Sequence, residues 1–443
     1  MRSLRLLPLL VVALALLAVA APAAGQTDPD SHSQNVKRLA TLAKTGTVNS
    51  DLAFWGRLMI AGNYDGFRTI DISDPEAPVV LADFSCPGPQ GDVSVWKNLL
   101  FVSVDQVRTK PTCDSAPAPS SDITNPSNWE GIRIFDISNP ASPNYVTAVA
   151  TDCGSHTHTL VPDLANGRVL LYVLSYALRP GPHCGPGAYA AGQADSPLHE
   201  EISIVAVPLS NPAGAYVISK PKITGPVFEL GPPFDPTIGC HDVSVFLKLH
   251  MAAAACLSEG QYWDISDPVH PKTLEATHVD NPDIEIWHSS SFTWDGKVVI
   301  WGDESESGSC NTTDEADGRV WFYRLSAPTT PAGSFLIPRT QAGDYCSAHL
   351  FNVVPVKDRY LLTSSWYGGG VDVVDLTDLA NAKELGYYDA AGGSVWSAYW
   401  YNGFIYDNDI PRGQDVYLFS DRARAGAKRF PYMNPQTQEA LLR

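Results

Sequence analysis

The sequence predicts an all-β fold, a β-propeller of seven blades, from three observations. A strand-and-turn segment recurs along the chain, four strands can be assigned to each recurrence, and helical periodicity of any length is absent. Repetition of one four-strand unit is typical of propeller blades, whereas a β-sandwich would not repeat the same unit in this way.

The recurring segment is an alternating apolar strand that stops at a turn built from Ser, Asp or Asn and Pro. Its clearest copies are GFRTIDISDPEAP (66–78), GIRIFDISNPASP (131–143) and GQYWDISDPVHP (260–271). More divergent copies begin at residues 202, 319, 370 and 413. Two further strands precede each copy and one follows it, so we expect four antiparallel strands in each blade.

The ends of the chain indicate how the ring closes. The seventh unit has no fourth strand after its last copy, which ends at 421, and the apolar stretch VKRLATLAK from Val36 has no blade of its own. We therefore expect this N-terminal strand to complete the last blade, so that the propeller spans 36–421. The residues at 24–35 are expected to be a linker, and the tail at 422–443 is expected to lie outside the ring and to be poorly ordered.

The first residues predict export. Arg2 and Arg5 precede an apolar run, and Ala21-Pro22-Ala23 supplies the small residues that a signal peptidase requires, so residues 1–23 are interpreted as a cleaved signal peptide. A membrane anchor is the alternative, but the run is short and no basic flank follows it. No later stretch is apolar and long enough to span a bilayer, so we expect an extracytoplasmic protein in the periplasm or outside the cell.

The eight cysteines predict four disulfides, as is usual in exported chains. Each cysteine lies either shortly before an innermost strand or near the end of a second strand, and both positions belong to the same face of a propeller. The predicted pairs are 86–113, 153–184 and 240–256 within blades, and by exclusion 310–346 between neighbouring blades.

Four histidines take equivalent positions when the innermost strands are aligned by their apolar alternation: His156, His241, His288 and His349. The other blades carry Ser50, Gly91 and Trp396 there. Because the first residue of an innermost strand lies at the channel mouth, these imidazoles are expected to converge on one transition-metal ion, with Fe or Cu favoured and Zn as the alternative. The same arrangement could instead be structural, with each histidine bonding a turn between blades and the repetition inherited from one ancestral blade.

Other residues near the same face extend this hypothesis. His158 is a spare ligand candidate, and metal-bound histidines usually donate their second nitrogen to a carboxylate. The carboxylates that could take this part are Asp242, Glu259, Glu285, Asp303 and Glu304. No nucleotide or organic cofactor is predicted, because P-loop, G-x-S-x-G and H-E-x-x-H motifs are absent from the sequence.

The net negative charge of the chain limits the kinds of partner that it can bind. A net charge of −18 repels phosphate backbones, which argues against nucleic acid. The first functional hypothesis is a secreted scaffold that binds a protein, a glycan or a small ligand on its loop-rich, disulfide-stapled face. The alternative is an extracytoplasmic metalloenzyme, similar to an oxidase or oxygenase, with the four-histidine centre at the channel mouth.

The strand-and-turn copies, together with segments such as CHDVSVF (240–246), resemble the LVIVD-repeat family of exported bacterial and archaeal proteins. The resemblance covers 36–421, although the individual repeats diverge. It implies a propeller and an extracytoplasmic location. It implies no single activity, because one fold hosts many functions.

Overall fold

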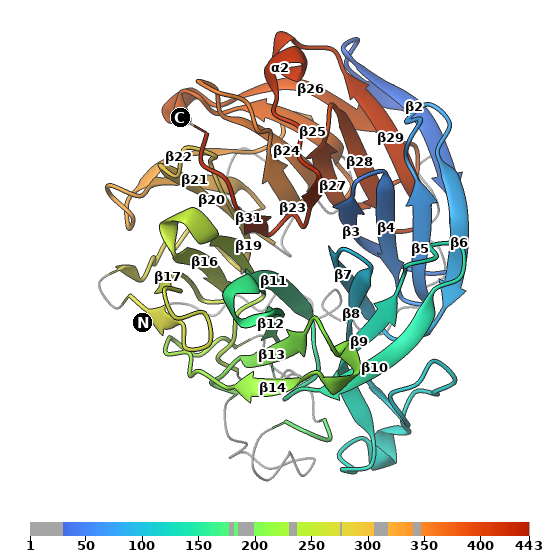
Figure 1. Ribbon diagram of the computed structural model, residues 1–443. Helices are drawn as coiled ribbons and strands as arrows, with labels where there is room; N and C mark the ends of the chain where they lie inside the picture. Colours follow the sequence, from blue (N-terminus) through green and yellow to red (C-terminus); the bar gives the residue numbers. More distant parts are fainter. Residues whose placement is uncertain are drawn as a thin grey trace.

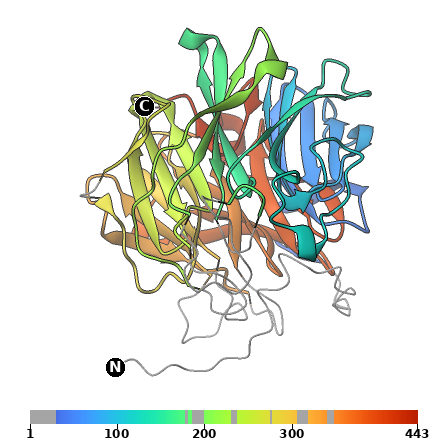
Figure 2. The same ribbon diagram turned by 90° about the horizontal axis from the view of Figure 1, so that it is seen from below.

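The computed structural model describes residues 30–176, 181–184, 199–229, 237–274, 277–304, 318–339 and 347–442. Seven antiparallel sheets surround a central axis, which confirms the predicted β-propeller (Figure 1). Seen from the side, the strands run between two faces of a disc (Figure 2).

The two inner strands of each blade position the channel mouths. The innermost strands, in blade order, are β3 (Asn49–Trp55), β7 (Gln90–Trp96), β11 (Thr157–Asp163), β15 (Asp242–Phe246), β19 (Trp287–Phe292), β23 (Ala348–Val353) and β27 (Val395–Tyr401). The second strands are β4 (Leu58–Asn63), β8 (Leu99–Arg108), β12 (Arg168–Leu174), β16 (Met251–Cys256), β20 (Val298–Asp303), β24 (Leu361–Trp366) and β28 (Phe404–Asp409).

The two outer strands form the rim of the disc. The third strands, which include the recurring segment of the sequence, are β5 (Gly66–Asp71), β9 (Trp129–Asp136), β13 (Ser203–Pro208), β17 (Glu259–Asp264), β21 (Val320–Arg324), β25 (Gly370–Asp375) and β29 (Gly413–Phe419). The fourth strands are β6 (Val79–Ser85), β10 (Asn144–Ala150), β14 (Tyr216–Ser219), β18 (Lys272–Thr273), β22 (Pro331–Phe335), β26 (Lys383–Asp389) and β2 (Val36–Ala43).

The N-terminal strand closes the last blade, as predicted. Strand β2 pairs antiparallel with β29, from Val36 opposite Phe419 to Ala43 opposite Gly413. The two-residue strand β1 (Ser31–His32) adds to the edge of the sixth blade by pairing with β26. Both ends of the ring are therefore joined by backbone hydrogen bonds.

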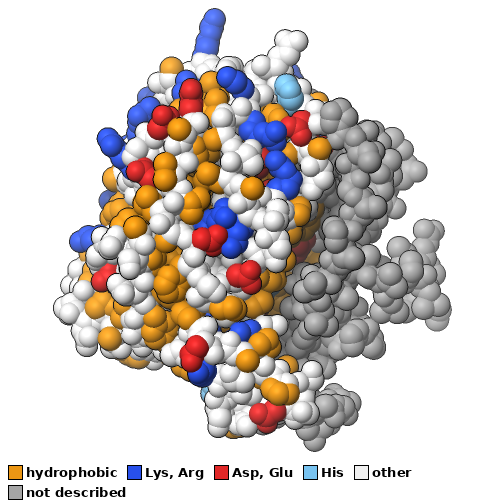
Figure 3. Space-filling model, turned by 90° about the vertical axis from the view of Figure 1, so that its right-hand side faces the viewer, with side chains coloured by type: hydrophobic (Ala, Val, Ile, Leu, Met, Phe, Trp, Pro, Cys, Tyr) orange, Lys and Arg blue, Asp and Glu red, His pale blue; other side chains and the backbone are white. Residues whose placement is uncertain are grey.

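The hydrophobic core is divided among the interfaces between blades. At one interface, Trp294 and Phe322 of the fifth blade pack with Phe351 and Trp366 of the sixth, and all four side chains are buried. Burying one such side chain stabilises the fold by roughly 1.5–3 kcal/mol. On the rim formed by β2 and β6, side chains of both charges are interspersed (Figure 3).

The C-terminal tail differs from the expectation. Its residues up to 442 are described, with a short helix α2 (Arg422–Gly426) and the strands β30 (Tyr432–Met433) and β31 (Thr437–Gln438). Strand β30 pairs with β3, and β31 pairs with β15. The expectation that the tail lies outside the ring and is poorly ordered was therefore wrong. The sequence pattern did not reveal these short pairings, because they carry no apolar alternation.

Three of the predicted disulfides are confirmed: Cys86–Cys113, Cys153–Cys184 and Cys240–Cys256. Cys310 and Cys346 lie outside the described residues, so that pair stays a prediction. Three disulfides indicate an oxidising, extracytoplasmic environment. Among the helices of the described ranges, none is long and apolar enough to cross a membrane.

Candidate metal centre at the channel mouth

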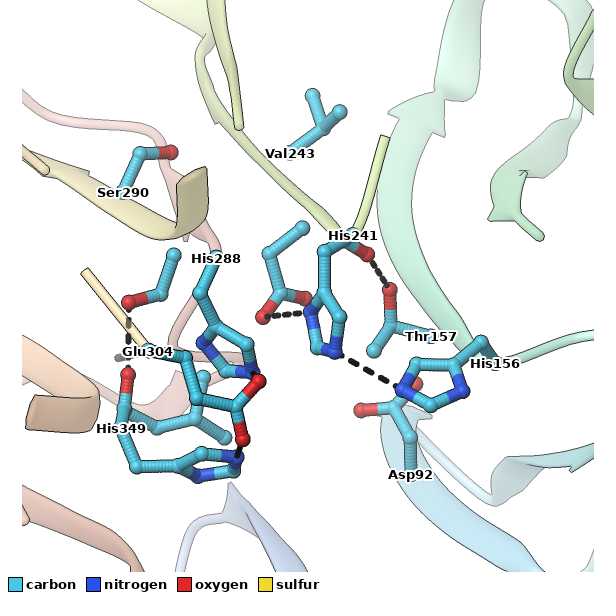
Figure 4. A network of polar contacts seen from close by, with 12 residues as sticks. Asp92, His156, Thr157, His241, Val243, His288, Ser290, Glu304 and His349 are labelled. Atoms are coloured by element: carbon cyan, nitrogen blue, oxygen red, sulfur yellow. Dashed lines mark hydrogen bonds and ion pairs between the residues drawn. The ribbon is translucent and has the colours of Figure 1, made fainter. Parts of the chain in front are cut away.

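The four aligned histidines lie together at one mouth of the channel (Figure 4). His156 and His241 directly precede β11 and β15, while His288 and His349 are the second residues of β19 and β23. The strand register shifts across His288 and across His349. Such bulges re-aim a side chain, which explains why these imidazoles can face the axis.

The residues that directly follow His156 and His288 carry hydroxyl groups, and these groups form hydrogen bonds to the neighbouring blades next to the histidines. Thr157 Oγ1 donates to the carbonyl of His241, and Ser289 Oγ donates to the carbonyl of His349 at 2.6 Å. Each of these bonds joins one innermost strand to the next, so the backbone at His241 and at His349 is tied to the preceding blade.

The imidazoles form a continuous arc. The Nε2 atoms of His156 and His241 are 2.9 Å apart. The ring centroids of His241 and His288 are separated by 3.7 Å, and those of His288 and His349 by 4.4 Å. The structure therefore brings together all four residues that the sequence alignment selected.

Two of the four rings have an acceptor within hydrogen-bonding distance of Nδ1. His156 Nδ1 lies 2.6 Å from Asp105 Oδ2, and His349 Nδ1 lies 2.5 Å from the carbonyl oxygen of Trp396. His241 Nδ1 lies 3.4 Å from Asp242 Oδ2, and neither atom has a hydrogen-bond partner among the described residues. A carbonyl or carboxylate at Nδ1 fixes the tautomer that leaves the Nε2 lone pair available, which is the usual arrangement of histidines that bind metals.

His288 lies at the centre of the arc and is fully buried. Neither of its ring nitrogens has a hydrogen-bond partner among the described residues. The carboxylate of Glu304 lies beside it, with Oε2 3.4 Å from His288 Nε2 and Oε1 3.8 Å from His349 Nε2. Donor atoms of His241, His288 and Glu304 all lie within 4.8 Å of one another.

Burial keeps the inner imidazoles neutral. Desolvation lowers the pKa of His241, His288 and His349 well below the ordinary value, and the neighbouring imidazoles lower it further. Neutral imidazole is the form that ligates metals. Burial also raises the pKa of Asp242 to about 8, with Asp92 adding to the effect.

The predicted carboxylates divide into two groups. Asp242 and Glu304 lie next to the histidines, as expected. Asp303 instead accepts hydrogen bonds from the backbone of residues 285, 286 and 318. Glu259 pairs with Nδ1 of His278 at 2.7 Å, and the Glu285 side chain is exposed.

His158, the spare ligand candidate, belongs to a separate buried network. Its Nδ1 lies 2.8 Å from Asp92 Oδ2, and its Nε2 lies 2.6 Å from Ser94 Oγ. The residues match a catalytic triad in type, but Ser94 and His158 are each 2% exposed. Since both ring nitrogens are engaged and substrate cannot reach the hydroxyl, this network joins the second and third blades structurally.

Several residues around the cluster were missed by the sequence analysis. Asp105 holds His156, and Gln90 Nε2 donates to His156 Nε2 at 2.9 Å.

Three tyrosines that follow second strands surround the arc. Tyr64 donates to Gln90 Oε1 at 3.0 Å, Tyr367 donates to Glu304 Oε1 at 3.1 Å, and the Tyr176 ring lies 4.8 Å from that of His156. Their common position after the second strand was the available signal.

The fold and the site define a class: a seven-bladed β-propeller with a buried histidine–carboxylate cluster at one channel mouth. Residues 126–151, which include β9 and β10, match the model of the LVIVD repeat. The chain is therefore a seven-bladed β-propeller whose second blade matches the LVIVD repeat.

Solved structures with similar folds are other propellers. The periplasmic gluconolactonase PpgL of Pseudomonas aeruginosa has 10% identity and a TM-score of 0.55, over 88% of this chain and 97% of that protein. A proposed 6-phosphogluconolactonase of Bacteroides uniformis has 10% identity and a TM-score of 0.51, over 81% and 88%. At this identity the likeness shows the fold alone. No curated protein matches the chain.

Proposed function

We propose that this propeller is an extracytoplasmic metalloprotein that binds one transition-metal ion at the histidine-lined mouth of its channel. His241, His288 and Glu304 are the proposed central ligands, with His156 and His349 on either side. We also propose that residues 1–23 direct its export, in keeping with the oxidising environment that its disulfides indicate.

The observation that carries the proposal is the state of His288. A buried polar atom without a hydrogen bond costs roughly 1–3 kcal/mol, and His288 has two such nitrogens among the described residues. A metal ion bound through Nε2 would offset part of this cost. In His156 and His349, Nδ1 is held by a hydrogen-bond acceptor, which leaves Nε2 as the nitrogen that would bind the metal.

The donor set favours a borderline metal. Imidazole nitrogens with one carboxylate suit Fe, Cu and Zn, and we favour Fe or Cu. The bound ion would supply Lewis-acid or redox chemistry. The chain itself orients His156 through Asp105 and His349 through the Trp396 carbonyl, and keeps the inner imidazoles neutral by burial.

The exposure of the cluster favours a small molecule as the second ligand. The side chains of His156 and Glu304 are 13% and 22% exposed, whereas that of His288 is 0% exposed. Among the described residues the edge of the cluster is thus partly exposed and its centre is buried, which suits a small ligand better than a protein surface. A scaffold that binds proteins or glycans remains the alternative if the site holds no metal.

Elemental mass spectrometry tests the proposal. Untagged protein from the periplasm or medium is compared with a His241→Ala/His288→Ala variant and with a His32→Ala/His270→Ala control, whose substituted side chains are exposed. We expect about one equivalent of metal in the wild type and the control, and less than about a tenth in the cluster variant, with unchanged circular dichroism. Absence of metal from wild type, even after incubation with Fe, Cu and Zn, refutes the proposal.

A further inference from the structure

The C-terminal segment, residues 430–442, lies at the channel mouth opposite the histidine cluster. The histidines precede or begin the innermost strands, whereas this segment contacts the other ends of the same strands. Figure 1 shows it in dark red, running from α2 along the inner edge of the ring. Its contacts reach the innermost strands of blades one to six.

Two side-chain amides in this segment replace strand pairing. Asn434 Oδ1 accepts from the backbone nitrogen of Val95 at 2.7 Å, and its Nδ2 donates to the Val95 carbonyl at 3.0 Å. Gln438 does the same at Phe292, accepting at 3.1 Å and donating at 2.9 Å. Each amide therefore satisfies both backbone groups at the end of one innermost strand, in blades two and five.

The backbone between these amides pairs with the fourth blade. Val245 donates its N–H to the carbonyl of Gln436 at 2.8 Å, and β31 runs parallel to β15. The hydroxyl of Thr437 donates to the carbonyl of Leu160 in the third blade at 2.6 Å. These bonds are those by which an extended peptide is recognised when it adds to exposed strand edges.

Aromatic stacking anchors the entry of the segment. The ring of Tyr432 lies 4.3 Å from that of Trp55 at an interplanar angle of 9°, and 5.4 Å from that of Trp96 at 72°. Stacked and edge-on contacts of this kind add roughly 0.5–1.5 kcal/mol each beyond burial. The segment thus combines an aromatic anchor with amides four residues apart.

We propose that this mouth of the ring is a recognition surface for an extended peptide that bears amide side chains four residues apart, and that the chain's own C-terminal segment occupies it. The same segment of a second copy is the partner that fits when the surface is vacated. A tethered segment acts at an effective concentration on the order of millimolar, so it excludes competitors in the native chain. This inference does not depend on the metal.

Fluorescence anisotropy with a labelled peptide of residues 428–442 tests the surface. The full-length Asn434→Ala/Gln438→Ala variant has a weakened segment of its own, so we expect it to bind the peptide at least tenfold more tightly than wild type. A peptide carrying the same two substitutions is the control and should lose this binding. Equally weak binding of the peptide to variant and wild type overturns the proposal.

Hydrogen exchange provides a second readout that does not require the double variant. In wild type, the Val95 and Phe292 amides are held by Asn434 and Gln438. We expect Asn434→Ala to accelerate exchange in the β7 peptide at least tenfold while the β19 peptide stays protected. Unchanged exchange at β7 would show that the side-chain amide is not what binds there.

Discussion

The Nε2 atoms of His156 and His241 are 2.9 Å apart, although the two residues are 85 positions apart in the sequence. Two nitrogens that bind the same ion at ~2.0–2.1 Å lie ~2.9–3.4 Å apart when the angle at the ion is between a right angle and the tetrahedral angle. Without an ion, one of these nitrogens must carry a hydrogen and donate to the other. The same geometry therefore suits a hydrogen bond and a pair of metal ligands.

Asp105 is predicted to support the metal through His156. In Asp105→Asn the ring loses the carboxylate that orients it and raises its basicity, so metal affinity should fall by about 10–100-fold. Competition with a chelating dye measures this affinity. Asp114→Asn, an exposed position in the loop that follows β8, is the matched control and should bind metal as wild type does. Equal affinities in all three proteins would remove Asp105 from the site.

His158 is predicted to stabilise the fold without binding metal. In His158→Ala the buried Asp92 loses the partner that lies 2.8 Å away, and loss of one member of a buried pair typically costs about 3–5 kcal/mol. Urea denaturation should show this loss, while the metal content of the folded fraction should stay at the wild-type value. Loss of metal with little loss of stability would instead assign His158 to the site.

Asp409 is predicted to make stability fall as pH rises. Burial raises its pKa to about 7, although Arg412 lies 3.2 Å away and opposes the effect. An unfolded aspartic acid has a pKa of about 3.9, so the folded protein binds the additional proton between these values. The stabilisation is complete below pH ~4 and is lost by pH ~7, to the extent of up to about 4 kcal/mol.

The Asp409→Asn variant isolates this contribution, because the amide does not ionise. Unfolding free energies are measured in urea from pH 4 to pH 7.5. The unfolding free energy of wild type should fall relative to that of the variant as pH rises. A difference that is constant over this range would show that Asp409 is ionised in the folded state.

The Cys240–Cys256 disulfide is predicted to stabilise the ring by about 3 kcal/mol, from the loop entropy of its 16-residue separation. Replacing both cysteines with serine should lower the unfolding free energy by this amount in urea. The Cys86–Cys113 bond spans 27 residues, and its removal should cost about 0.5 kcal/mol more. Wild-type stability in both variants would contradict the contribution of these bonds.

The fold could be predicted because each blade repeats a local pattern. Apolar alternation followed by an Asp/Asn/Ser-Pro turn marks one strand in each unit, and the unpaired strand from Val36 required a partner at the other end. Three cysteine pairs followed in turn, since both cysteines of each pair lie at the same ends of neighbouring strands. Prediction therefore succeeded where the sequence repeats and side-chain position follows from strand register.

The rest of the site could not be predicted, because its residues lie where the sequence does not repeat and strand register does not fix the side-chain direction. Asp105 lies near the end of β8, and Tyr64 and Tyr176 follow second strands, where apolar alternation no longer fixes the direction of a side chain. The C-terminal segment carries its specificity in Asn434 and Gln438, whose amides imitate backbone pairing without an apolar pattern. Both features depend on contacts between blades far apart in the sequence.

The location of the ion tests the central claim most directly. Anomalous X-ray diffraction at the absorption edge of the bound metal, from crystals of the loaded wild-type protein, measures that location. We expect a single strong peak ~2.0–2.2 Å from nitrogens of His241 and His288 and from an oxygen of Glu304. A peak elsewhere on the molecule, or no peak between these residues at full metal loading, would contradict the account.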